Sequence, residues 1–207
     1  KLKKKSEENK IENEKEQVKR KTILPANYKE FLTSILSQND AGQSLPLVIG
    51  TVFYAVLDQF DSTRELKVKI HKVNEAGASS LEVGDIDIYE SDRLITTIEA
   101  KDKEFQSADV VHAAIKAVQG NLNHFYFIYH NTRKEICELQ SIKRDCINMG
   151  CEVTIITIDQ FIDFMFGLLN KVNFEKTSKF IIDSMDQMAV TDTFSRRVIS
   201  LISKYSV

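Results

Sequence analysis

Residues 84–101 read GDIDIYESDRLITTIEAK. Apolar and charged residues alternate in both halves of this stretch, which is typical of two half-buried strands joined by a tight turn. Side chains two positions apart in a strand point to the same face. Asp85 and Asp87 therefore share a face of the first strand, and Glu99 and Lys101 share a face of the second.

The pairing register of these two strands decides whether the two charged sets meet. If Asp87 lies opposite Thr97, all four charged side chains fall on one face and the apolar residues form the other. A shift of one residue mixes the two kinds on both faces. Because one face must pack on the core, we predict that Asp87 lies opposite Thr97. This register requires a turn of odd length, such as Ser91-Asp92-Arg93.

Carboxylates gathered on one face repel each other unless a cation joins them. Mg²⁺ prefers oxygen ligands, keeps several of its waters and accepts phosphate oxygens. A lysine such as Lys101, two residues after Glu99, can stabilise developing negative charge or position an attacking water. The pattern thus indicates phosphodiester hydrolysis at a Mg²⁺ site. The alternative interpretation is a surface ladder of salt bridges on an ordinary α/β domain.

Length and composition are those of a soluble globular protein with one domain: 207 residues, 43% hydrophobic and 28% charged. A net charge of −2 gives no general attraction to nucleic acid, so DNA binding would depend on local basic patches. The three cysteines have no CxxC spacing, the N-terminus has no secretory signal, and no apolar run is long enough to span a membrane, which together favour the cytoplasm. The chain does not begin with Met, so we expect residues upstream of it.

The pattern along the chain predicts an α/β fold, with an antiparallel meander followed by βαβ units. This gives a mixed central sheet of about five strands flanked by helices. Residues 1–22 are expected to form a charged linker or exposed helix, and residues 23–207 a nuclease-type domain with a C-terminal helical extension. The expected strands are 66–73, 83–90, 94–101, 125–129 and 153–158. The expected helices are 27–37, 47–60, 107–122, 133–149, 161–169 and the helical pattern over 175–205. Val111, Ile115, Val118 and Leu122 are expected to form the apolar stripe of helix 107–122.

At these residues the chain resembles the PD-(D/E)XK nuclease superfamily. That pattern has an acidic residue on one strand and (D/E)-X-K on the next, followed by a helix and an apolar strand. Here it reads Asp87, then Glu99-Ala100-Lys101, then the helix from Ser107 and the strand at Phe125. Within the superfamily the run looks closest to type II restriction endonucleases of the SacI-like group. The superfamily resemblance covers roughly residues 45–160.

The resemblance implies that Asp87 and Glu99 bind Mg²⁺ and that Lys101 is the catalytic lysine. It implies cleavage of double-stranded DNA by a homodimer, since cutting two strands takes two sites. A related junction resolvase, a repair or modification-dependent nuclease, and a non-catalytic DNA-binding or protein-interaction domain remain alternatives. Auxiliary candidates are Asp85 on the same face, Asp58 or Glu30 as a third acid from a preceding helix, and Lys103, Lys116 and Gln119 as DNA contacts.

Overall fold

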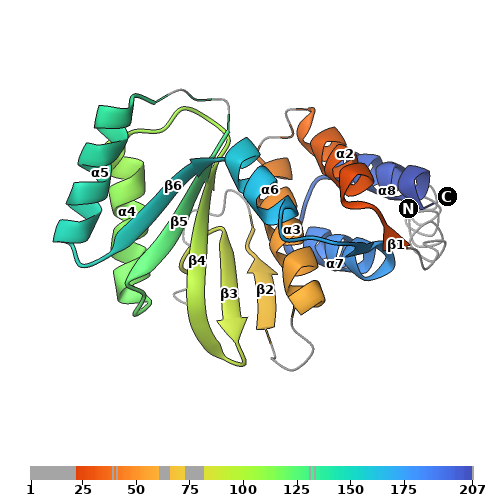
Figure 1. Cartoon of the computed structure of the whole chain (residues 1–207), viewed down its shortest axis with the longest axis horizontal. Coiled ribbons are helices and arrows are strands. Elements are labelled where there is room, and N and C mark those ends of the chain that lie inside the picture. Colours follow the sequence, from red (N-terminus) through yellow and green to blue (C-terminus); the bar gives the residue numbers. More distant parts are fainter. Residues whose placement is uncertain are drawn as a thin grey trace, which may run out of the picture.

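A mixed five-stranded sheet with helices on both of its faces forms the centre of the computed structural model (Figure 1). The structure describes residues 22–38, 40, 42–60, 66–72, 82–130, 132 and 134–206. The predicted linker over residues 1–22 lies outside this part of the chain, apart from Thr22. The predicted α/β class with a mixed sheet is confirmed.

The sheet has the order β2-β3-β4-β5-β6, antiparallel from β2 to β4 and parallel from β4 to β6. The predicted meander followed by βαβ units is therefore correct. The strands of this sheet are β2 (Leu66–Ile70), β3 (Ile86–Glu90), β4 (Arg93–Lys101), β5 (His124–Tyr129) and β6 (Glu152–Thr157). A separate small pair, which the sequence pattern did not predict, is formed by β1 (Thr22–Ile23) and β7 (Val172–Asn173).

The described helices follow the predicted order, with boundaries shifted by a few residues. The helical pattern over 175–205 divides into two helices, because the chain turns between Met188 and the N-cap Thr191. The helices are α2 (Pro25–Leu36), α3 (Ser44–Phe60), α4 (Ser107–Gln119), α5 (Ile136–Asn148), α6 (Ile158–Phe166), α7 (Phe174–Gln187) and α8 (Asp192–Tyr205).

The hairpin of β3 and β4 has the predicted register but not the predicted turn. Asp87 lies opposite Thr97, as expected. The turn has two residues, Ser91 and Asp92, and Ser91 takes a left-handed conformation with φ of 56°. A β-bulge compensates for the even turn length: Tyr89 pairs with Leu94 and Ile88 with Thr96, which leaves Ile95 without a partner. The extra residue restores the parity that the hydrophobic pattern demands.

Two separate cores lie on the two faces of the sheet. On one face Ile86, Ile98 and Ile128 pack in a core shared with α2, α3, α6, α7 and α8. On the other face Phe127 packs with Phe105 in a core shared with α4 and α5. Glu99 pairs with Phe127 in the neighbouring parallel strand, so the charged side of the hairpin faces the layer of α4 and α5.

Helix α4 packs through small residues rather than through the predicted apolar stripe, so that prediction was wrong. Ile115 and Val118 are 42% and 40% exposed, and Leu122 is buried only beyond the end of the helix. The buried positions are Val110, Ala113, Ala114 and Ala117. Alanines let the helix approach the sheet closely, and Lys116 then lies at the border between α4 and the charged hairpin face.

Helix α3 is the most deeply enclosed of the described helices. It contacts β2, α2, α6 and α7, and its residues from Ser44 to Val52 are all buried. This burial within the protein accounts for its nearly uninterrupted apolar sequence. In the described part of the chain, the helices fall short of the length and hydrophobicity that crossing a membrane requires.

Truncation of Ile98 should show how strongly the central strand depends on its core. Its side chain is fully buried, so Ile98→Ala should lower the free energy of unfolding by about 2–5 kcal/mol. Ile95→Ala, at the bulge of the same strand, serves as the control; there we expect a change within about 0.5 kcal/mol. Urea denaturation followed by circular dichroism measures both, and equal losses would contradict this account of the sheet.

Candidate active site

Asp85 and Glu99 face each other at the end of the β3–β4 hairpin. Ile86 pairs with Ile98, so the antiparallel register continued by one residue places Asp85 opposite Glu99. The Oδ2 atom of Asp85 accepts a hydrogen bond of 2.8 Å from the backbone N–H of Ala100. Both residues are half-buried.

The two carboxyl groups lie close together in a poorly solvated site, and this raises the pKa of each. Burial raises the pKa of Glu99 to about 8, and the adjacent charge of Asp85 adds to the shift. Burial also raises the pKa of Asp85, against the opposing hydrogen bond from Ala100. Lys116 and Lys101 lower both pKa values but do not outweigh burial. A cation between the two acids would favour their ionised forms.

Lys101 is tied to the following helix by an ion pair. Its Nζ lies 2.9 Å from Oδ1 of Asp109, which occupies the first turn of α4. The other oxygen of Asp109 accepts a hydrogen bond of 2.7 Å from the backbone N–H of Gln106, which completes a capping box. That backbone hydrogen bond and Lys101 together lower the pKa of Asp109. The carboxylate of Asp109 thus stays charged and holds the lysine on the hairpin face.

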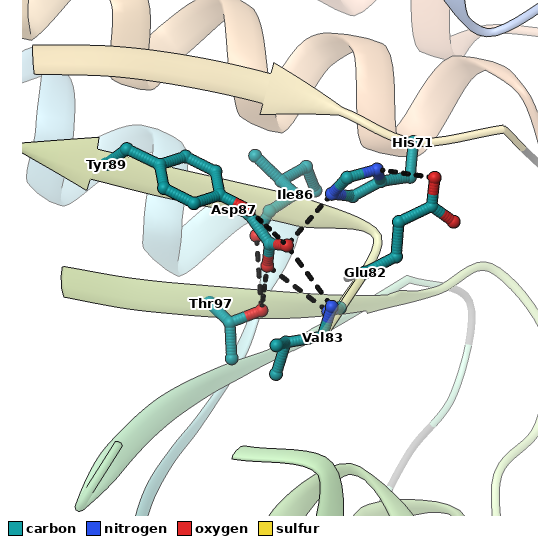
Figure 2. A network of polar contacts seen from close by, with 8 residues as sticks. His71, Glu82, Val83, Ile86, Asp87, Tyr89 and Thr97 are labelled. Atoms are coloured by element: carbon teal, nitrogen blue, oxygen red, sulfur yellow. Dashed lines mark hydrogen bonds and ion pairs between the residues drawn. The ribbon is translucent and has the colours of Figure 1, made fainter. Parts of the chain in front are cut away.

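Asp87 occupies a different environment, although it shares a face with Asp85. Its side chain is fully buried, and Figure 2 shows it enclosed by polar groups of the protein. Burial tends to raise its pKa, but hydrogen bonds from His71, Thr97 and the N–H of Val83 prevail and lower it. Burial and the Asp87 carboxylate raise the pKa of Tyr89 to about 12, so the phenol stays protonated as a donor.

Of the other candidates, the structure places only Lys116 near the pair of acids. Asp58 forms an ion pair of 2.7 Å with Lys176 of α7, and Glu30 is exposed on α2. Lys103 is exposed just beyond β4, and Gln119 is exposed in the last turn of α4. Among the described residues, no acid from a helix that precedes β3 is one of the main charged groups that act on Asp85 or Glu99.

The donor set fits a hard cation with few protein ligands. Among the described residues, no group of three or more His, Cys, Asp or Glu side chains is arranged to hold a metal ion. Mg²⁺ does not need such a group, because it commonly binds through one or two carboxylates and completes its shell with water and phosphate oxygens. Asp85 and Glu99 supply two carboxylates with oxygen donors, and the two nearby lysines suit an anionic substrate.

A comparison with known families gives a match. The family model for the SacI restriction endonuclease C-terminal domain matches residues 21–130, which is more than half of the chain. The chain belongs to this family. The predicted relationship to SacI-like type II restriction endonucleases is therefore confirmed, and the protein is a nuclease of the restriction type. Among curated proteins, none matches the chain.

Two polar residues of this SacI-family domain escaped the sequence analysis. Asp109 could have been noticed, because an acid three residues into a helix start typically caps that helix, and this helix directly follows Lys101. His71 gave no comparable signal. It lies just after the first strand of the meander, and its relation to Asp87 follows only from the pairing of β2 with β3.

The raised pKa of Glu99 should appear in the pH dependence of stability. The folded protein binds a proton at Glu99 between its ordinary pKa near 4.5 and about 8, whereas the unfolded chain does not. Wild-type stability should therefore fall as pH rises through this range, whereas Glu99→Gln removes that slope. Urea unfolding at pH 5 to 9 in EDTA should show that the free energy of unfolding of the variant rises relative to that of wild type as the pH increases. Parallel profiles would mean that Glu99 is ionised throughout.

Proposed function

We propose that this protein is a Mg²⁺-dependent endonuclease that hydrolyses phosphodiester bonds of double-stranded DNA, in the manner of a type II restriction enzyme. The observation that carries the proposal is the placement of Asp85 opposite Glu99, with Lys101 on the same face of the hairpin. Membership of the SacI family supports restriction-type nuclease activity. In this proposal Asp85, rather than Asp87, joins Glu99 as a metal ligand.

Each residue of the site has a separate task. Mg²⁺, when bound, neutralises charge on the scissile phosphate and lowers the pKa of a coordinated water. In their ionised forms, Asp85 and Glu99 would hold the cation at the end of the hairpin. Lys101 has three N–H donors, and its bond to Asp109 leaves others to contact a phosphate oxygen or the attacking water. Lys116 adds positive charge from the α4 side.

The DNA backbone would lie along the open part of the same sheet face. Lys67 and Lys69 are exposed on β2, and Lys69 lies opposite Asp87, so both lysines share the face that carries the acidic pair. Helices α4 and α5 pack on β5 and β6 on this side, whereas the lysines of β2 remain exposed. These lysines offer the local positive charge that the net charge of −2 does not.

Cleavage assays with single-site variants test the proposal. With Mg²⁺, we expect discrete fragments from phage DNA, and a rate loss of about 100-fold or more in Asp85→Asn, Glu99→Gln and Lys101→Ala. Asp163→Asn, in a surface ion pair with Lys29, is the matched control and should cut normally. A homodimer should convert supercoiled plasmid to linear DNA without accumulating nicked circles.

Other outcomes would identify the alternatives. Cleavage restricted to branched DNA would indicate a junction resolvase, and cleavage restricted to modified DNA a modification-dependent nuclease. DNA binding without cleavage in Mg²⁺, Mn²⁺ or Ca²⁺ would contradict the enzymatic proposal and leave a non-catalytic binding domain.

Removal of the β2 lysines should weaken DNA binding without regard to sequence. In Lys67→Ala with Lys69→Ala, the slope of log affinity against log salt should fall by roughly one for each lysine lost. Fluorescence anisotropy with a labelled duplex, in Ca²⁺ and between 50 and 300 mM salt, measures the slope. Lys29→Ala, on α2 and in an ion pair with Asp163 of α6, is the control for loss of one surface lysine and should leave the slope unchanged. An unchanged slope in the double variant would remove β2 from the DNA interface.

A further inference from the structure

Asp87 carries the most completely satisfied polar side chain near the site. His71 donates from Nε2 to its Oδ2 at 2.9 Å, and the hydroxyl of Tyr89 lies 3.3 Å from the same atom (Figure 2). Thr97 donates from Oγ1 to Oδ1 at 2.5 Å. The backbone N–H groups of Val83 and Gly84 each donate at 3.2 Å, one to each oxygen.

These five donors use the whole acceptor capacity of the carboxylate. A carboxylate offers about four lone-pair sites, and a buried one is costly unless hydrogen bonds replace its water. Asp87 is 0% exposed, so a metal ion could reach it only by breaking several of these bonds. The geometry suits a structural anchor better than a metal ligand.

The anchor acts on the short segment 83–85 that leads into β3. Two of its hydrogen bonds come from backbone N–H groups of this segment, at Val83 and Gly84. His71 holds the same segment a second time, because its backbone N–H donates to the carbonyl oxygen of Asp85 at 2.9 Å. The imidazole of His71 is itself buried between Asp87 and Glu82, whose Oε1 lies 3.2 Å from Nδ1.

Gly84 shows how tightly this segment lies against β4. A Cβ atom at this position would lie 2.4 Å from Oγ1 of Thr97 and 2.7 Å from the carbonyl oxygen of Ile98. Only glycine permits that approach without displacement of the strand. The close contact brings the next residue, Asp85, to the N–H of Ala100 and to the side of Glu99.

We propose that Asp87, His71 and Thr97 form a buried clamp that fixes the segment 83–85 and thereby aims Asp85 at the metal site. These three are positioning residues, and the inference rests on the proposed function, in which Asp85 and Glu99 hold the metal. In this arrangement the two acids of the GDID run have different tasks: Asp85 binds the cation, and Asp87 holds the backbone that presents it.

Metal affinity, measured without DNA, tests the clamp. Isothermal titration of EDTA-treated protein with Mn²⁺ should show binding by wild type and none by Asp85→Asn. Thr97→Val and His71→Gln should bind about tenfold more weakly, because an unclamped Asp85 loses its orientation. Thr97→Ser keeps the hydroxyl and should restore the affinity. Thr96→Val is the matched control, since the Thr96 hydroxyl makes no hydrogen bond in the structure, and it should bind as wild type does.

Protein NMR adds a readout at the clamp itself. In ¹⁵N-labelled protein, the amide signals of Val83 and Gly84 should move in Asp87→Asn and Thr97→Val but not in Thr96→Val. This readout also covers the case in which Asp87→Asn folds poorly, because Thr97→Val keeps the carboxylate of Asp87 and its other four donors.

The possible outcomes separate the clamp from the proposed function. If wild type binds Mn²⁺ and the Thr97→Val, His71→Gln and Asp87→Asn variants bind it equally well, the clamp is overturned and the metal site stands. If Asp85→Asn keeps its affinity while Asp87→Asn loses it, Asp87 is the ligand, as the sequence resemblance implies, and the clamp is again overturned. If wild type binds neither Mn²⁺ nor Mg²⁺, the proposed function itself fails.

Discussion

The bulge at Ile95 is the constraint on which the site depends. A two-residue turn without it would place Asp85 on one face of the hairpin and Glu99 on the other. One unpaired residue in β4 corrects the parity, so that the acidic pair shares one face with Lys101 while Ile86, Ile88 and Ile98 lie on the other. The energy for this arrangement comes from the core, because Ile86, Ile88 and Ile98 can be buried together only in this register.

The sequence predicted the register from this same requirement, but it could not predict how the chain satisfies it. Alternation over 84–101 determines which faces must meet, whereas an odd turn and an even turn with a bulge meet the condition equally well. The prediction of an apolar stripe on α4 was wrong for a related reason. Hydrophobicity favours Ile115 and Val118 as the buried positions, yet close packing on the sheet selects alanines, and side-chain size outweighs transfer energy there.

The two acids of the GDID run show a further limit of sequence reasoning. Asp85 and Asp87 lie on one face and two residues apart, so alternation treats them alike. What distinguishes them is the neighbouring strand β2, which brings His71 over Asp87, and the threonine directly opposite on β4. These neighbours are remote in sequence, and they turn one carboxylate into a buried, fully bonded group while the other stays beside Glu99.

Strand β2 forms one edge of the sheet in the described part of the chain, and its exposed lysines affect how separate molecules meet in solution. An edge strand with free backbone groups can pair with the edge of another molecule, which is a common route to aggregation. Lys67 and Lys69 alternate along this edge and are exposed, so a second strand approaching it would bring its own side chains against two positive charges. The same lysines that suit a phosphate backbone therefore also help to keep the sheets of separate molecules apart.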